Sequence, residues 1–198
     1  VHDGKKGVEG ITAALVQRPD EIKLCWQKNH IAVVVDPQWQ TLGMIEFDVL
    51  VDAILAKKNL GTNKDSAPLV IGLGPGFYAG KDVHMVVETN RGHNLGRIIT
   101  SGKAEPNTGI PGAIGGFAEE RVLRATTDGK FQSSLSIGEH VRADEIVGSV
   151  AGYEVRARID GVIRGLIRPQ SLVNTGMKIG DIDPRGQASY CYTISEKA

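Results

Sequence analysis

Four aliphatic runs in the first half of the chain predict buried strands. The runs are "HIAVVVDP" from His30, "FDVLVDAILAKKN" from Phe47, "APLVIGLGPG" from Ala67 and "DVHMVVETN" from Asp82. Each is continuous in Val, Ile or Leu and is bounded by polar, Gly or Pro residues, as in parallel strands that are covered on both faces. Residues 19–29 predict a helix, with Pro19 near its first turn. We therefore expect an α/β domain, Rossmann-like with a mostly parallel sheet, over residues 1–100.

A repeat of 32 residues organises the last third of the chain. "DGKFQSSLSIGEHVRADEIVGSV" from Asp128 aligns with "DGVIRGLIRPQSLVNTGMKIGDI" from Asp160. Two units of this size can cover each other's apolar faces, so residues 126–184 predict a two-fold repeated β barrel. Gly and Pro are frequent just before it, so residues 101–125 predict a linker. Residues 185–198 predict a C-terminal tail.

The repeat resembles the biotinyl/lipoyl-type barrel, in which a "dG-x-[IV]" pattern opens a strand in each half. The resemblance implies a small all-β lipoyl/biotinyl-like barrel with an internal repeat. Carrier domains of that family hold a modified Lys on the hairpin between the halves. Here the joining segment is "AGYEVRARI", residues 151–159, and it contains no Lys. The barrel is therefore predicted to be a docking or assembly module and not a covalent carrier.

Charge and cysteine content argue against several classes of function. The chain has 23 basic and 23 acidic side chains, so it lacks the basic excess typical of nucleic-acid binding. No apolar run approaches the roughly 20 residues of a membrane span. Cys25 and Cys191 lie far apart without zinc-ligand spacing, so no metal site is predicted. Two unpaired cysteines fit a reducing, cytoplasmic location.

Glycine residues after one predicted strand suggest a phosphate cradle. "GLGPGFYAG" contains Gly74, Gly76 and Gly80, and glycine lets backbone N–H groups approach an anion closely. The spacing departs from the dinucleotide-binding fingerprint, and no Walker-type GKS or GKT follows. A tight turn between two buried strands is the alternative interpretation.

A second polar stretch follows the next predicted strand. "ETNRGHNLGR" contains Glu88, Asn90, Arg91 and His93. Arg91 suits recognition of phosphate or carboxylate, and Glu88 and His93 have acid–base chemistry. The alternative is that Glu88 pairs with an Arg and that His93 is an ordinary surface residue.

These stretches are predicted to meet, because ligands of open α/β sheets bind outside the carboxyl ends of the strands. "AKKN" would add two cations to such a crevice, whereas Asp36 and Asp52 are expected to act as caps. The predicted cofactor-binding residues are Lys57, Lys58, Asn59, Gly74, Gly76, Gly80, Glu88, Asn90, Arg91 and His93.

Longer strings resemble the YqeB family of accessory proteins of the selenium-dependent molybdenum hydroxylase system. They are "LAKKNLGT", "GLGPGFYAG", "ETNRGHNLGR" and "KIGDIDPRG", and the resemblance extends from about Gly7 to the last residue. It implies a cytoplasmic protein that helps to mature molybdenum hydroxylases. Family members begin further upstream and continue beyond "SEKA", so we expect this chain to be part of a longer protein.

The predicted function is an accessory or maturation factor that binds a phosphate-bearing ligand, either a molybdopterin-type cofactor or a nucleotide. The alternative is a non-catalytic scaffold that docks the target hydroxylase. Whether the chain is an enzyme is left open, because it contains neither GxSxG nor HExxH. The expected partners are the molybdenum hydroxylase or other maturation factors, and not nucleic acid or membrane; a homo-oligomer is left open.

Cys191 is considered as a carrier of sulfur or selenium. That role requires exposure and a lowered pKa. A small buried residue is the alternative.

Overall fold

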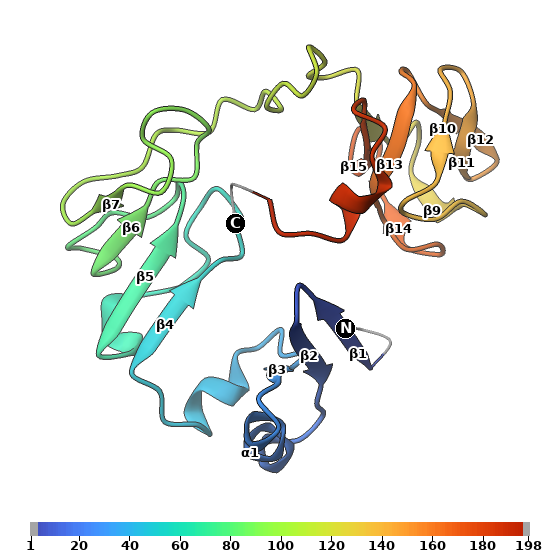
Figure 1. Cartoon of the computed structure of the whole chain (residues 1–198). Helices are drawn as coiled ribbons and strands as arrows, with labels where there is room; N and C mark the ends of the chain where they lie inside the picture. The colour runs from blue at the N-terminus through green and yellow to red at the C-terminus, as the bar shows by residue number, and fades with distance from the viewer. Residues whose placement is uncertain (1–3, 196–198) are drawn as a thin grey trace. The chain divides into compact units, whose positions relative to one another are not determined.

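The computed structural model describes residues 4–195, which divide into two compact units (Figure 1). Unit 1 comprises residues 4–108 and unit 2 comprises Gly109–Ser195. The boundary between the two units, after Thr108, lies within the predicted linker 101–125. The predicted division into an α/β domain, linker, barrel and tail stays a prediction. The outermost parts of the predicted ranges 1–100 and 185–198, namely residues 1–3 and 196–198, lie outside the described residues.

Unit 1 begins with a three-stranded sheet. β1 (Lys5–Val8) and β2 (Ile11–Leu15) form an antiparallel hairpin, and β2 pairs in parallel with β3 (Ile31–Val33). The helix α1 (Pro19–Gln27) makes the crossover between the two parallel strands. A 3-10 helix, η1 (Gln40–Gly43), follows β3.

The helix α1 forms where the sequence predicts it. Pro19 occupies the first turn, where its missing N–H group has no intrahelical partner to lose. The carboxylate of Glu21 accepts the N–H of Gln17 at 2.9 Å, which closes the N-terminus. Ile22 and Cys25 are buried together on one face. The prediction of a helix within residues 19–29 is therefore confirmed.

The second sheet of unit 1 contains β4 (Val49–Asp52), β5 (Leu69–Leu73), β6 (Met85–Val87) and β7 (Ile98–Ile99), in that order (Figure 1). β4, β5 and β6 are parallel, and β7 runs antiparallel to β6. Parallel neighbours end at the same edge of a sheet. The carboxyl ends of β4, β5 and β6 therefore share one edge.

No α-helix lies in the crossovers of this second sheet. A short 3-10 helix, η2 (Lys64–Ser66), precedes β5, and residues 74–84 lead from β5 to β6 without a helix. Phe77 of that segment packs against Gly72, where an added Cβ would come within 2.5 Å of the ring. Phe77 and Val83 are buried with Val70 of β5. The crossover itself therefore covers one face of the sheet.

The opposite face of this sheet is aliphatic and partly exposed. The register places Val51, Ile71 and Met85 side by side on it, and Val87 opposite Ile98. The exposed fractions of Val49, Val51 and Ile98 are 47%, 48% and 65%. Parallel sheets are normally covered on both faces, so this surface is unusual for such a sheet.

Unit 2 consists of two four-stranded antiparallel sheets. The first has the order β10 (His140–Val141), β13 (Gly161–Leu166), β15 (Lys178–Asp183), β8 (Val122–Arg124). The second has the order β12 (Tyr153–Arg156), β11 (Ile146–Val150), β9 (Gly129–Gln132), β14 (Leu172–Val173). Buried aliphatic side chains from both sheets, together with Phe131, form one core. A 3-10 helix, η3 (Ala188–Cys191), follows β15.

The repeat of 32 residues is visible in the strands. β9 begins at Gly129 and β13 at Gly161, while β11 begins at Ile146 and β15 at Lys178. The same offset relates β10 to β14. Each strand of the first sheet corresponds, 32 residues away in the sequence, to one strand of the second sheet, and the corresponding strands follow one another in the same order. Each sheet contains strands of both repeats.

The predicted fold class is wrong. The structure is mostly β, with one α-helix in the described residues, and is not a Rossmann-like α/β fold followed by a lipoyl/biotinyl-like barrel. The aliphatic runs do form parallel strands, but most crossovers are too short or too rich in turns to contain a helix. In residues 4–195 no strand pairing joins the two sheets of unit 2, which form a half-barrel. Within the same range, no helix has the length and hydropathy needed to cross a bilayer.

Glycines at equivalent positions of the repeat allow the strands of unit 2 to cross closely. A Cβ on Gly148 would lie 2.4 Å from the carbonyl oxygen of Gln132, and one on Gly180 would lie 2.5 Å from that of Gly165. Both glycines follow a shift in strand register. Backbone packing therefore requires glycine at both positions.

We expect Gly148→Ala to lower the free energy of unfolding by about 1–3 kcal/mol, the usual effect of forcing extra atoms into a packed core. Thermal or urea unfolding followed by circular dichroism measures the change. Ser149→Ala, which adds no atoms to the same strand, is the matched control and should differ little from the wild type. Equal stability of the Gly148→Ala variant and the wild type would contradict the steric explanation.

Candidate functional site

Three loops meet where β4, β5 and β6 end. A Cβ on Gly76 would lie 2.8 Å from the backbone of Lys58, and one on Gly74 would lie 2.4 Å from the Oγ1 atom of Thr89. The turn after β5 is thus in contact with the loop after β4 on one side and with the loop after β6 on the other. We call this region, residues 53–62, 74–76 and 88–97, the loop edge.

Packing between the loops explains why glycine is needed at the loop edge. Gly74 and Gly76 have φ values of 79° and 119°, which disfavour other residues, and each lacks room for a side chain. The N–H of Gly74 donates to the carbonyl of Val87 at 2.8 Å, which ties the turn to β6. The turn is therefore a rigid part of the edge.

Three basic side chains and one histidine lie at the surface of the loop edge. Lys57, Lys58, Arg91 and His93 are all exposed. Lys57 has a left-handed backbone conformation, with φ of 64°, within the loop that contacts Gly76. The structure thus brings together the predicted lysines, the two glycines and the start of the Arg91 segment.

Glu88 has a structural role. Its side chain is 3% exposed, and its two carboxylate oxygens accept the N–H groups of Asn90 and Glu105, each at 2.7 Å. It therefore fastens the loop after β6 to residue 105. A carboxylate used in this way is poorly placed to exchange protons with a ligand.

The two predicted asparagines also hold the chain in place. The side chain of Asn59 donates to the carbonyl of Thr62 and accepts the N–H of Gly61, both at 2.8 Å. Asn90 donates to the carboxylate of Glu105, and this hydrogen bond lowers the pKa of Glu105. Both amides stabilise turns of the loop edge.

Gly80 lies away from the loop edge. Its N–H donates to the carbonyl of Val83 at 2.8 Å, in the turn that leads into β6. The neighbouring Ala79 bridges to Gly102, which follows β7. Since β7 is antiparallel to β6, this places Gly80 near the amino ends of the parallel strands. The structure does not bring it to Gly74 and Gly76.

Asp36 caps the 3-10 helix η1, as the sequence predicts, whereas Asp52 caps no described helix and instead holds a turn. Asp36 accepts the N–H groups of Gln40 at 3.0 Å and Thr41 at 2.6 Å. Asp52 is buried and accepts the N–H of Ile54 at 3.1 Å and the hydroxyl of Thr62 at 2.6 Å. Thr62 is a member of the loop edge that sequence reasoning missed, because a lone Thr in a loop gives no signal.

A polar groove beside the loop edge was also missed. It has a volume of about 360 Å³ and lies along β7, with Arg97, Lys103 and Glu105 among its walls. Arg97 donates to the side chain of Asn94 at 3.1 Å. Lys103 and Glu105 lie in the segment predicted to be a linker, which is why the sequence did not associate them with a site.

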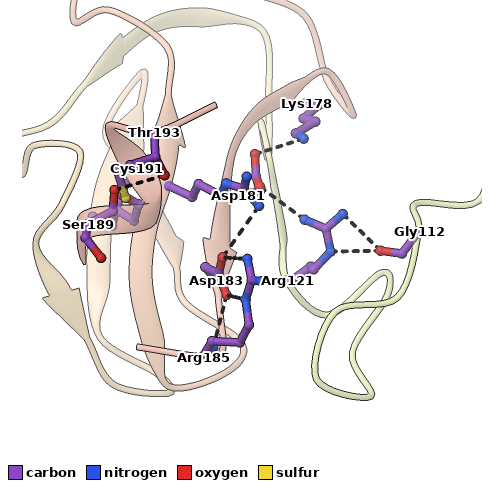
Figure 2. A network of polar contacts seen from close by, with 11 residues as sticks. Gly112, Arg121, Lys178, Asp181, Asp183, Arg185, Ser189, Cys191 and Thr193 are labelled. Atoms are coloured by element: carbon purple, nitrogen blue, oxygen red, sulfur yellow. Dashed lines mark hydrogen bonds and ion pairs between the residues drawn. The ribbon is translucent and has the colours of Figure 1, made fainter. Parts of the chain in front are cut away.

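Unit 2 contains a network of ion pairs (Figure 2). Asp181 lies between Lys178 and Arg121, with N–O distances of 3.0 Å to each. The guanidinium of Arg121 also donates to the carbonyl of Gly112, through Nε at 3.2 Å and a terminal nitrogen at 3.1 Å. The network therefore fastens the segment around Gly112 to β15.

Cys191 lies in η3, close to this network (Figure 2). Its thiol donates to the carbonyl of Ile163 at 3.6 Å, and burial raises its pKa. A raised pKa keeps the thiol protonated, whereas a carrier of sulfur or selenium requires the thiolate. Cys191 is partly buried, and the raised pKa of its thiol argues against the role of carrier.

The whole chain aligns with a known protein. It is 45% identical over 198 residues to the uncharacterized protein YqeB of Escherichia coli strain K12, and the alignment covers 100% of this chain and 37% of that protein. The comparison supports the resemblance to YqeB that the sequence motifs indicate. The chain thus spans just over a third of the length of its YqeB relative. No protein-family model matches the chain.

Two solved structures resemble the fold weakly. One is an aspartoacylase family protein from Mesorhizobium loti, with 13% identity, a TM-score of 0.31 and coverage of 60% of this chain and 44% of that chain. The other is a succinylglutamate desuccinylase/aspartoacylase from Rhodobacter sphaeroides, with 18% identity, a TM-score of 0.32 and coverage of 59% and 45%. Likenesses this weak assign no function.

We expect Asp183→Asn to destabilise unit 2 in a pH-dependent way. Asp183 is 1% exposed and pairs with Arg185 at 2.6 Å and Arg164 at 3.5 Å. Its hydrogen bonds from Arg185 hold its pKa below the usual value. Losing the carboxylate should lower the free energy of unfolding at pH 7 by about 2–3 kcal/mol, less than for a fully buried pair because Arg185 stays partly solvated.

Because the pKa of Asp183 is lower in the folded protein than in the unfolded chain, its ionised carboxylate stabilises the fold above the unfolded pKa. This stabilisation is lost as the pH falls through the pKa of the folded state. The difference between the wild type and Asp183→Asn should thus be constant above about pH 5 and narrow below about pH 4. Urea unfolding across this range measures it. Glu154→Gln, which breaks the exposed pair with Arg156, is the control and should change stability by less than about 1 kcal/mol. A difference that does not vary with pH would rule out this role for Asp183.

Proposed function

We propose that the chain belongs to an accessory or maturation factor for selenium-dependent molybdenum hydroxylases, and that the loop edge binds a phosphate-bearing ligand of the molybdopterin or nucleotide type. The family resemblance supports the role. The contact of Gly76 with the backbone of Lys58 supports the location, because it holds two exposed lysines against the turn after β5. The ligand would be cargo passed to the hydroxylase.

The residues of the loop edge are better suited to binding an anion than to catalysing a reaction. Lys57, Lys58 and Arg91 present positive charge at the surface, where a phosphate group can reach them. The carboxylates of Glu88 and Asp52 already accept hydrogen bonds from the protein. Among the described residues no group of three or more His, Cys, Asp or Glu is placed to hold a metal ion. Binding through the phosphate is therefore the favoured interaction.

Removing the two lysine charges should weaken phosphate binding. We expect the K57Q/K58Q variant to bind pyrophosphate about tenfold more weakly than the wild type, a loss of about 1.4 kcal/mol, and with a smaller dependence on salt. Isothermal titration calorimetry at two salt concentrations measures both quantities. Lys64→Gln is the matched control, because Lys64 is exposed and lies in the same β4–β5 connection but near the start of β5. Equal affinities of K57Q/K58Q and the wild type would falsify the location.

A non-catalytic scaffold is the second candidate, favoured by the aliphatic face of the β4–β7 sheet. Val49, Val51 and Ile98 present apolar area there that a partner protein would bury. A molybdenum hydroxylase is the partner that the family resemblance implies.

If the scaffold proposal holds, Val51→Glu should abolish binding to a purified selenium-dependent hydroxylase of the xanthine-dehydrogenase type, because a buried unpaired charge opposes association. Surface plasmon resonance measures the interaction. Val35→Glu, at a position that is 72% exposed outside this face, should leave it unchanged. Retained binding by Val51→Glu would exclude this face as the docking surface.

A further inference from the structure

The loop that follows β4 has an unusual backbone at residues 55–58, which we call the amide run. Leu55 and Lys57 have φ values of 58° and 64°, whereas φ of Ala56 between them is not positive. The left-handed conformation is unfavourable for a residue with a Cβ, and it persists where the surrounding structure imposes it. Where left-handed residues alternate with ordinary ones, successive N–H groups turn to one side of the chain and form a concave surface for an anion.

The amide run has hydrogen-bond donors without protein acceptors. Among the described residues 4–195, no acceptor takes up its N–H groups, and no carboxylate pairs with the ammonium groups of Lys57 and Lys58. The N–H of Ile54, just before the run, donates to Asp52 at 3.1 Å. All residues of the run are exposed. An anion can therefore replace the water at these donors without breaking a hydrogen bond of the protein.

The amide run is anchored on both sides. Before it, the carboxylate of Asp52 accepts the N–H of Ile54 and the hydroxyl of Thr62 at 2.6 Å. At its end, the backbone of Lys58 lies against Gly76, where an added Cβ would come within 2.8 Å. Anchored donors need little ordering when an anion binds, which favours affinity.

Backbone donors and lysine side chains recognise different features of an anion. An ammonium group on a flexible stem is a point charge that attracts phosphate and carboxylate alike. A fixed group of N–H donors instead matches a compact anion that offers several oxygens at once. A terminal phosphate carries three strong acceptor oxygens and up to two charges, whereas a carboxylate has two oxygens and one charge.

We propose that the N–H groups of the amide run hold the terminal phosphate of a phosphate monoester, while Lys57 and Lys58 attract it. The assignment rests on the proposed function for the presence of a phosphate-bearing ligand. It adds the atoms that hold the phosphate, and it sets aside ligands whose only anionic groups are carboxylates.

Amide resonances test the proposal directly. We expect pyrophosphate, which has terminal phosphates, to move the ¹H–¹⁵N signals of residues 55–58 downfield with saturation, because their N–H groups gain charged acceptors. Citrate, a polyanion of carboxylates, and sodium chloride at equal ionic strength should move them far less. Signals of the amide run that stay in place overturn the proposal, whether or not pyrophosphate binds elsewhere.

A pair of variants at Leu55 separates backbone geometry from charge. Leu55 is 41% exposed, so neither Leu55→Gly nor Leu55→Val should open the core. Glycine adopts the left-handed conformation readily, whereas a β-branched residue strongly disfavours it. We expect calorimetry to show pyrophosphate binding by Leu55→Val that is about tenfold weaker than binding by Leu55→Gly.

The same exchange elsewhere is the control for Leu55→Val. Leu172→Val, at a position in unit 2 that is 76% exposed, should bind pyrophosphate like the wild type. Circular dichroism checks that each variant is folded. Equal affinities of Leu55→Val and Leu55→Gly overturn the proposal, because a site made of lysine charge alone does not depend on the backbone at residue 55.

The two proposals fail in different ways. If K57Q/K58Q loses pyrophosphate binding while both Leu55 variants bind alike, the amide run is rejected and the lysine site stands. If Leu55→Val loses binding while K57Q/K58Q binds like the wild type, the amide run stands and the role of the lysines is rejected.

Discussion

The close approach of the Gly74–Gly76 turn to its neighbours is the constraint on which the loop edge depends. Backbone atoms of Lys58 fill the space on one side of the turn, and Thr89 fills it on the other. Each loop therefore limits the movement of the next. Backbone packing sets the spacing of the three loops, and the long charged side chains remain at the surface, where they can reach an anion.

In unit 2 a close backbone approach at a glycine occurs once in each repeat, but the ion pairs do not follow the repeat. Gly148 and Gly180 permit equivalent close crossings in the two repeats. The ion-pair network is not repeated, because Asp181 and Asp183 correspond to Ser149 and Ala151 in the first repeat. The acidic pair on β15 forms ion pairs with Arg121 and Arg185. The two sheets therefore share their glycine contacts and aliphatic packing but differ in their ion pairs.

Local features of the sequence predicted local structure well. The Pro19 helix and the cap at Asp36 formed as expected, since each depends on residues within one or two turns of chain. The fold class failed because continuous aliphatic runs indicate parallel strands but not the elements that cover them. The crossover through Phe77 covers its sheet without a helix. Glu88 was predicted to face a ligand, but its partner, the N–H of Glu105, lies 17 residues away and could not be inferred.

The sequence by itself determined where the strands β3 to β6 form and that the last third is a repeat, because these follow from residue type and spacing. Tertiary structure alone decided that Gly76 meets Lys58, that Gly80 lies apart and that Thr62 binds Asp52. The physical reason is that such contacts depend on the paths of whole crossovers. A path is set by the sum of many weak packing terms, which no short motif encodes.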